Sequence, residues 1–291
     1  MGGHPFYIAD VFAEKKYAGN QLGIVRNAGN MTSGEMLAIT REMNYSETTF
    51  ILSDTPVDGG YDVRIFTPGG EVPFAGHPTL GTAALIRSEI ATGNPERIEL
   101  NLKVGKIPVT VENDIFWMKQ INPEFGETFA PDEIAPIIGM ESADIDGSLP
   151  VRWVSTGLPA VIVPLKNLEA VKRVRINREY YGPFIERIGK ALILVFCKET
   201  LEPENHIHDR VLVPCLGIEE DPATGSANGC LAAYLARYRF FGGPHIENIR
   251  IEQGYQVNRP SLLLLTAKDS GGDVDVHVGG KVVITARGNL L

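Results

Sequence analysis

The sequence predicts an α+β protein of two pseudo-symmetric domains, each a mixed, mostly antiparallel sheet wrapped around one central buried helix. Three observations lead to this class. Strand patterns outnumber helix patterns, two segments half a chain apart repeat the same order of residues, and the helix in each repeat is apolar on nearly every side. A helix that is hydrophobic all round is buried, so each repeat supplies a core helix for its own sheet.

The repeated segment consists of a strand, a turn, an acidic residue, a glycine-rich loop and an apolar helix. Its first copy begins with Arg64-Ile-Phe-Thr-Pro68 and reaches its helix at Gly76. The second copy begins with Arg210-Val-Leu-Val-Pro214 and reaches its helix at Gly225. Because backbone N–H groups at a helix N-terminus attract anions, the two helix starts predict a cradle for an anionic group.

Strands are expected where Val, Ile, Thr and Phe dominate or alternate with polar residues. In the first half these stretches are 6–11, 48–52, 62–67 and 97–111. In the second half they are 151–154, 160–165, 192–196, 210–213, 249–252, 262–267 and 274–285. The glycine pairs at 271–272 and 279–280 predict hairpin turns in the last stretch.

Helices are fewer. Thr32 and Glu35 form a capping-box pattern that predicts a helix reaching Met43. Apolar residues at helical spacing predict another helix over 178–190, and the repeat helices are expected over 79–86 and 227–235. We place an N-terminal domain at 1–120, with a final strand at 281–291 that can return to complete it, and a C-terminal domain at 121–280.

The composition narrows the class of protein. The 291 residues carry a net charge of −9 and no basic stripe, which argues against a nucleic-acid partner. Three cysteines without CxxC spacing indicate a reducing compartment and no disulfide framework. The N-terminus Met-Gly-Gly-His-Pro does not resemble a signal peptide, and no apolar run is long enough for a bilayer. We therefore expect a cytoplasmic protein with no membrane partner.

Two residues of the first half have the chemistry of proton transfer. Glu47 stands where a helix pattern gives way to an apolar strand, and a partly buried carboxylate there is suited to exchange a proton near neutral pH. His77 follows Gly76 at the mouth of the first repeat helix, where it can donate to a substrate oxygen as a general acid. The structural alternatives are an exposed strand-end glutamate and a local helix cap.

The corresponding loop of the second half reads Asp221-Pro222-Ala-Thr-Gly-Ser226. An aspartate before a proline is typical of a helix N-cap, which is the structural alternative to a catalytic role for Asp221. Gly225 allows close backbone approach, and Ser226 adds a hydroxyl and an N–H group at the helix start. Together these residues predict a cradle for a carboxylate.

Other chemistries have weaker support. His206 and His208 have strand spacing for two metal ligands, but no third ligand accompanies them and a polar loop is the better interpretation. Cys230 lies inside an apolar helix, where an inert thiol is expected. The sequence has no nucleophile elbow, P-loop or dinucleotide motif. We therefore predict a reaction that uses no metal and no organic cofactor.

Seven short motifs resemble those of the phenazine biosynthesis-like (PhzF) family, in the right order and over nearly the whole chain. They are Gly19-Asn20-Gln-Leu-Gly23, Ser46-Glu47-Thr48, Arg64-Ile-Phe-Thr-Pro68, Glu71-Val-Pro-Phe-Ala-Gly-His-Pro-Thr-Leu-Gly81, Glu220-Asp-Pro-Ala-Thr-Gly-Ser-Ala227, Gln253-Gly254 and Arg259-Pro-Ser261. The resemblance implies a diaminopimelate epimerase-like fold with the active site in a cleft between the halves. It also implies a homodimer that works without a cofactor.

The resemblance further implies that Glu47 shuttles a proton and that His77, Asp221 and Ser226 are active-site residues. Substrate-binding positions are expected in the same motifs, at Asn20, Gly76, Thr79, Thr224 and Gly225. Two departures accompany the match. Gln21 replaces a usual proline, and the thiols of the epimerases are missing, with Ala75 in the first loop and Pro222 near the second. A racemisation by two thiols is therefore disfavoured.

These residues predict a cofactor-independent isomerase that shuttles a proton by acid/base chemistry on a small unsaturated carboxylate metabolite. An epimerase, racemase or dehydratase on the same fold is the alternative enzyme, and product stereochemistry with deuterium exchange distinguishes it. A non-catalytic metabolite-binding protein is the alternative of a different class. Tight binding of a metabolite without deuterium exchange is the result expected of that class.

Overall fold

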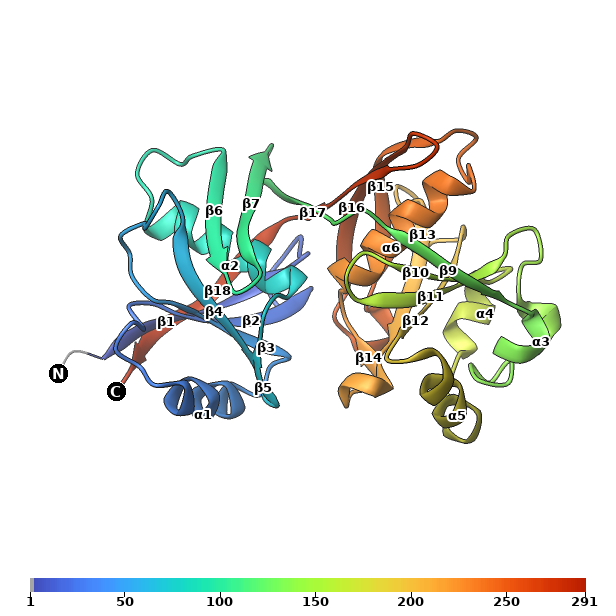
Figure 1. Ribbon diagram of the computed structural model, residues 1–291, viewed down its shortest axis with the longest axis horizontal. Coiled ribbons are helices and arrows are strands. Elements are labelled where there is room, and N and C mark those ends of the chain that lie inside the picture. Colours follow the sequence, from blue (N-terminus) through green and yellow to red (C-terminus); the bar gives the residue numbers. More distant parts are fainter. Residues whose placement is uncertain (1–2) are drawn as a thin grey trace. The chain divides into compact units, whose positions relative to one another are not determined.

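The computed structural model describes residues 3–291. Met1 and Gly2 lie outside the described residues; they are the first residues of the N-terminal segment that does not resemble a signal peptide. The protein is α+β, with many strands and few helices (Figure 1). It divides into two compact units, one formed by Met1–Met118 with Gly279–Leu291 and the other by Lys119–Val278. Within residues 3–291, none of the helices has the length and apolar character needed to cross a membrane.

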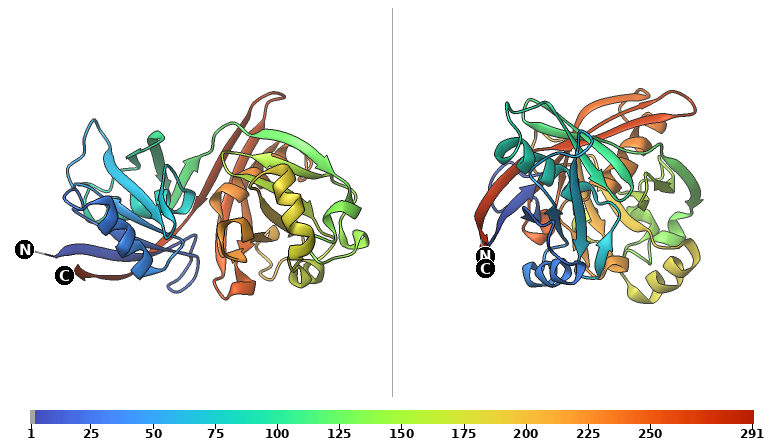
Figure 2. Two further views of the ribbon diagram at one scale, coloured as in Figure 1. Left: turned by 60° about the horizontal axis from the view of Figure 1, so that its bottom comes forward. Right: turned by 60° about the vertical axis from the view of Figure 1, so that its left-hand side comes forward.

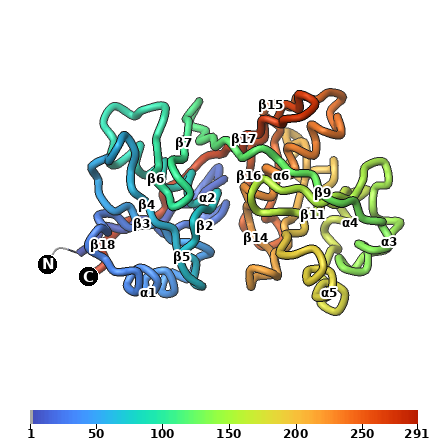
Figure 3. Tube along the Cα trace, in the orientation of Figure 1, coloured from blue at the N-terminus to red at the C-terminus, as the bar shows by residue number. Residues whose placement is uncertain are grey.

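The sheet of the first unit begins with β1, which pairs antiparallel with both β2 and β18. The chain ends meet in this unit, and Figure 3 shows the blue β1 beside the red β18. From β2 the pairing continues parallel to β3, antiparallel to β4, and from β4 antiparallel to β5 and parallel to β6. β7 pairs antiparallel with β6 and β8. The strands are β1 His4–Val11, β2 Asn20–Val25, β3 Glu47–Ile51, β4 Tyr61–Thr67, β5 Gly70–Val72, β6 Arg97–Leu102, β7 Gly105–Glu112, β8 Ile115–Lys119 and β18 Val282–Leu290.

The sheet of the second unit has the same order of pairings. β10 pairs antiparallel with β9 and β11, β11 is parallel to β12, and β12 is antiparallel to β13. β13 then pairs antiparallel with β14 and parallel with β15, which is antiparallel to β16. The strands are β9 Glu124–Phe129, β10 Val151–Ser155, β11 Pro159–Pro164, β12 Leu192–Cys197, β13 Ile207–Leu212, β14 Glu220–Asp221, β15 His245–Gln253, β16 Ser261–Asp269 and β17 Val274–Gly280.

One helix in each unit lies among the strands, and the others lie outside (Figures 1 and 2). α2 contacts β1, β2, β3, β6, β7 and β18, whereas α6 contacts β10, β11, β12, β15 and β16. Both are buried along most of their length, so the predicted burial of the two repeat helices is confirmed. The helices are α1 Ser33–Met43, α2 Gly76–Glu89, α3 Pro131–Ile134, α4 Leu168–Arg173, α5 Arg178–Ile188 and α6 Gly225–Arg237, with short 3-10 turns at Ser142–Asp144, Pro214–Leu216 and Tyr255–Val257.

Local signals at helix ends predicted α1 correctly. The Thr32 hydroxyl accepts from the Glu35 N–H group at 3.3 Å, and the Glu35 carboxylate accepts from the Thr32 N–H group at 2.7 Å. The helix ends at Met43, and Asn44 takes the left-handed conformation of a C-cap. This abrupt end matters for the site, because β3 starts with Glu47 only three residues later.

The hairpin turn predicted at residues 279–280 is wrong. Gly279 and Gly280 are the last residues of β17, and β18 begins at Val282. Gly279 is needed for close packing instead, since a Cβ there would lie 2.4 Å from the ring of Trp117. The stretch 97–111 forms a hairpin of two strands. The sequence pattern missed β2, β5, β8, β9, β14, α3 and α4.

Candidate active site

Glu47 is the first residue of β3 and lies opposite Leu22 of the parallel strand β2. The next four residues of β3 are buried, whereas the Glu47 side chain keeps 19% of its exposure. The left-handed turn at Asn44 directs the chain from α1 into this strand. The carboxylate therefore stands at the end of a buried strand, with part of its surface open to solvent.

His77 is the second residue of α2 and lies next to Glu47. Its Nε2 atom is 3.4 Å from Oε2 of Glu47, and its side chain is only 8% exposed. Burial lowers the pKa of His77 to about 3, although a hydrogen bond to the Gln21 backbone acts in the opposite direction. The imidazole is therefore neutral at physiological pH, and the contact is not an ion pair of two charged groups.

The hydrogen bonds of His77 indicate which nitrogen of its neutral ring carries the proton. A bond to the backbone that raises the pKa of an imidazole is one in which a ring N–H group donates to a carbonyl oxygen. Among the described residues Nε2 has no hydrogen-bond partner of normal geometry, so we assign that donor to Nδ1. In a neutral ring the other nitrogen then carries a lone pair, and this lone pair lies on the side of Glu47.

The other site residues predicted in the first unit surround the start of α2. Asn20, the first residue of β2, is 2% exposed, and Gly76 is the first residue of α2. The Thr79 hydroxyl donates to the Ala75 carbonyl at 2.7 Å, so its proton is used within the helix start. Ala75 occupies the N-cap position without a side-chain cap, and the first turn has no acidic residue. Such an uncapped helix start is suited to an anion.

The predicted residues of the second unit form one tight turn. Asp221 belongs to β14, and its Oδ2 atom accepts from the Thr224 hydroxyl at 2.5 Å. Asp221 is thus not the N-cap of α6, because the helix begins at Gly225 and Thr224 occupies the cap position. Ser226 is half-buried, and its carbonyl accepts from the Thr156 hydroxyl at 3.3 Å.

The interpretation of His208 as part of a polar loop is wrong. His208 lies in β13, is fully buried, and its Nδ1 atom is 2.7 Å from Oε1 of Glu252. Glu252 also accepts from the backbone N–H groups of Leu201 and Glu202 and from the side chain of Asn205. This cluster holds a loop of the second unit in place. Among residues 3–291 no group of three or more His, Cys, Asp or Glu side chains is placed to bind a metal ion.

Asp209, the neighbour of His208, is a fully buried carboxyl group whose two oxygens have no hydrogen bond of normal geometry within the described residues. Burial raises its pKa well above the usual value, and Glu220 and Glu252 raise it further, while the nearby Asn228 amide opposes part of the rise. Between the unfolded-state pKa and this raised native pKa, the folded protein therefore keeps a proton on Asp209 that the unfolded chain has released.

Replacing Asp209 with Asn is expected to stabilise the protein at neutral pH. Between the unfolded-state pKa of about 4 and the raised native pKa, the free energy of unfolding falls as pH rises, by about 1.4 kcal/mol per pH unit. Asn is nearly isosteric and carries no such proton, so the stability of the Asp209→Asn variant relative to the wild type should increase as pH rises above the unfolded-state pKa. Urea unfolding at several pH values measures this difference. An equal loss of stability at every pH would contradict the prediction.

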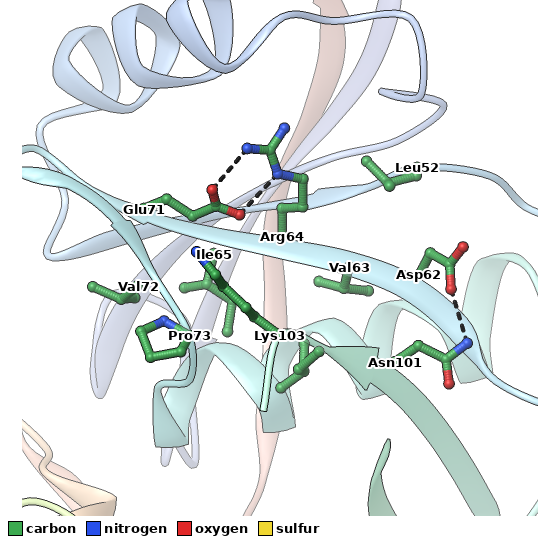
Figure 4. Close-up of a pocket in the computed structure, with 11 residues that line it drawn as sticks. Leu52, Asp62, Val63, Arg64, Ile65, Glu71, Val72, Pro73, Asn101 and Lys103 are labelled. Carbon is green, nitrogen blue, oxygen red and sulfur yellow. Dashed lines mark hydrogen bonds and ion pairs between the residues drawn. The ribbon is translucent and has the colours of Figure 1, made fainter. Parts of the chain in front are cut away.

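A surface cavity of about 480 Å³ in the first unit does not include the Glu47–His77 pair. It lies beside β4, where Arg64 and Glu71 form a two-bond ion pair and Asn101 donates to Asp62 (Figure 4). Its charged groups are largely paired with each other, and no predicted site residue lines it. We therefore take the residues at the helix start of each unit, and not those of this cavity, as candidate site residues.

The structure also gives roles to two residues that the sequence analysis named only as parts of motifs. The Gln21 backbone orients His77, and Gln253 bonds to the loop of Asp221 and Thr224. The signal for Gln253 was the Gln253-Gly254 motif at the end of a predicted strand. Cys197, Cys215 and Cys230 are free thiols. Burial raises the pKa of Cys230 to about 11, as expected of an inert thiol.

Comparison with known proteins gives a consistent result over the whole chain. A family model described as phenazine biosynthesis-like protein (PhzC-PhzF) matches residues 9–288. The trans-2,3-dihydro-3-hydroxyanthranilate isomerase of Pseudomonas aeruginosa is 31% identical, and the match covers 98% of either chain. A crystal structure of a PhzF-family phenazine biosynthesis protein from Bacillus anthracis is 31% identical, covers 100% of both chains and has a TM-score of 0.90. The structure of a predicted epimerase from Pseudomonas aeruginosa is 32% identical, covers 99% of both chains and has a TM-score of 0.79.

Other curated relatives are also named isomerases. The class of protein that these relatives define is an isomerase. The chain belongs to the phenazine biosynthesis-like family, in agreement with the resemblance of its motifs.

Proposed function

We propose that this protein is a cofactor-independent isomerase that moves a proton within a small unsaturated carboxylate metabolite. The observation that carries the proposal is the pair formed by Glu47 and the neutral, buried His77, 3.4 Å apart at the uncapped start of α2. A carboxylate can take a proton from carbon and return it elsewhere, which needs no metal or organic cofactor.

In the proposed reaction Glu47 removes a proton from a carbon atom next to the unsaturated system. Its new O–H group then donates to the lone pair of His77 Nε2, which stabilises the protonated carboxyl group. Because the pKa of His77 is about 3, the proton stays on Glu47 and is returned to another carbon of the substrate. This geometry favours an acceptor role for His77 over the donor role expected from its position in the sequence.

The substrate carboxylate is expected to bind at the N-terminus of a helix. Both α2 and α6 begin without a side-chain cap and without an acidic residue in the first turn, and such N–H groups bind anions. We include Asn20, Gly76, Thr79, Thr224 and Gly225 as binding residues, and Asp221 and Ser226 as groups that orient the conjugated part of the substrate.

The duplicated architecture is part of the proposal. The same residue order around Arg64 and Arg210, and the same order of strand pairings in the two units, support an origin from two related halves. We also propose that the protein is a homodimer, as the family resemblance implies, and that it is cytoplasmic, as its composition predicts. Light scattering on the purified protein measures the oligomeric state.

Incubation with trans-2,3-dihydro-3-hydroxyanthranilate in D₂O tests the reaction. This compound is the substrate named for the Pseudomonas aeruginosa relative, and other small unsaturated carboxylates extend the panel. We expect an isomer whose new C–H bond carries less than full deuterium, because Glu47 returns part of the original proton. Binding of these acids without product or deuterium exchange would contradict the proposal and favour a metabolite-binding protein.

An epimerase is the second candidate, and the similarity to the predicted epimerase structure favours it. The absence of thiols at Ala75 and Pro222 speaks against the two-thiol route. Cys230 does not replace them, because burial raises the pKa of its thiol to about 11 and the thiolate is the reactive form. Inversion of a stereocentre with full deuterium incorporation would identify an epimerase.

A further inference from the structure

We propose that Gln253 is a positioning residue that holds Asp221 and the first turn of α6 in a single arrangement. The proposal rests on the proposed function, because it assumes that Asp221 contacts the substrate. Gln253 is the last residue of β15 and is completely buried. No role for it follows from the acid/base chemistry, since an amide does not titrate.

The Gln253 amide bonds to the loop through all of its polar atoms. Its Oε1 atom accepts from the Thr224 N–H group at 3.2 Å and from the Asn228 side chain at 2.9 Å. Its Nε2 atom donates to the Asp221 carbonyl at 2.8 Å and to the Thr224 hydroxyl oxygen at 3.2 Å. Three of these four bonds end on Asp221 or Thr224, so one rigid side chain fixes both residues of the turn.

Thr224 passes this constraint to the Asp221 carboxylate. A threonine at an N-cap normally accepts from a backbone N–H group in the first turn of its own helix, but Thr224 makes no such bond. Its hydroxyl donates to Asp221 Oδ2 at 2.5 Å instead. Because Gln253 Nε2 donates to the same oxygen, it occupies a lone pair of Thr224 and directs the hydroxyl proton toward Asp221.

The residue after Gln253 brings the strand close enough for these bonds. Gly254 has φ +79°, and a Cβ at this position would lie 2.4 Å from the carbonyl oxygens of Pro222 and Arg259. No other residue type fits without moving the loop. Asn228, on the first turns of α6, completes the arrangement by donating to the Thr224 carbonyl at 3.3 Å.

The helix start in the first unit has a different arrangement. The Thr79 hydroxyl donates to the Ala75 carbonyl at 2.7 Å, and Ala75 gives the N-cap no side-chain hydrogen bond. We infer that the second loop needs its buried amide because it carries a carboxylate whose direction matters. A misplacement of about 1 Å at a reacting group can cost about 10²-fold in rate.

The test combines kinetics with a signal that needs no substrate. Gln253→Met keeps the length of the side chain and removes its hydrogen bonds. Gln256→Met is the matched control, because Gln256 lies in the following 3-10 turn and its amide contacts His208, not the loop of Asp221. With trans-2,3-dihydro-3-hydroxyanthranilate we expect Gln253→Met to lower kcat by about 10²-fold with a much smaller change in KM. In an Asp221→Asn background the same substitution should cause little further loss, because residues that act as a unit are not additive.

The carboxyl resonance of Asp221 in ¹³C-aspartate-labelled protein reports the position of this group directly. We expect Gln253→Met and Thr224→Val to shift or broaden it, and Thr224→Ser, which keeps the hydroxyl, to restore it. Gln256→Met should leave it unchanged. An unaltered resonance in both Gln253→Met and Thr224→Val would overturn the positioning role. If Gln253→Met fails to fold, the comparison of Thr224→Val with Thr224→Ser tests the same role. If the variants shift the resonance but the wild-type protein turns over none of the acids tested, the proposed function is rejected and the positioning role of Gln253 is retained.

Discussion

Glu47→Gln is expected to lower turnover by about 10²–10⁴-fold, the contribution typical of general acid–base catalysis. Gln has nearly the same shape and can still bond to His77, but it cannot take a proton from carbon and return it. Substrate affinity should change far less than kcat, because the carboxylate of the substrate is expected to bind at backbone N–H groups. Steady-state kinetics with deuterium exchange in D₂O measures both effects.

Glu99→Gln is the matched control for this substitution. Glu99 lies in β6 of the same unit, and its side chain is 19% exposed, as is that of Glu47. It pairs with Arg97 at the surface, so its loss should leave turnover unchanged. If Glu47→Gln folds normally and retains full turnover on a confirmed substrate, the proton shuttle is wrong.

Arg210→Met is expected to destabilise the protein by about 3–5 kcal/mol, as removal of one partner from a buried ion pair does. The Arg210 guanidinium binds Glu220 through Nε and Nη2, and the two side chains are only 4% and 6% exposed. Its Nη1 atom also donates to the carbonyls of Val171 and Val174 at 2.9 and 3.0 Å. The substitution would leave a buried carboxylate and the end of α4 without their donor.

Arg64→Met offers a control from the first copy of the repeat. Arg64 binds Glu71 with the same two-bond geometry, at 2.9 and 2.8 Å, but the two side chains are 26% and 27% exposed. Exposed ion pairs contribute about 0.2–1 kcal/mol, so this substitution should cost far less. Urea unfolding of both variants measures the difference, and equal losses would show that burial does not set the strength of these pairs.

Arg210→Lys separates charge from geometry. Lysine keeps the positive charge, but its single nitrogen cannot bind a carboxylate with two bonds and several carbonyls at once. We expect Arg210→Lys to lose most of the stability that Arg210→Met loses. A stability close to that of the wild type would mean that charge alone stabilises this part of the second unit.

Much of the local structure could be predicted from the sequence. The capping box at Thr32 and Glu35 predicted the start of α1, and the apolar residues on nearly every side predicted both core helices. The motifs also identified the family. These signals depend on residues a few positions apart, and contacts over such distances are set by the geometry of one element.

Other features of the structure could not be predicted from local sequence patterns. Residues 279–280 resemble a turn, yet Gly279 serves the packing of Trp117. His208 and Asp209 resemble loop polarity, yet both are fully buried in β13. In each case the deciding contact comes from another strand or ring distant in the sequence, and a local pattern cannot record it.

The sequence by itself determined the α+β class, the family and the residue types that carry the chemistry. Only the tertiary structure decided which of these residues meet. It places Nε2 of His77 beside Glu47, joins Gln253 to the loop of Asp221, and buries Arg210 while leaving its repeat counterpart Arg64 partly exposed. The physical reason is that proton transfer, positioning and ion-pair strength depend on distances and burial. Both are set by the register of strands and the packing of helices that lie far apart along the chain.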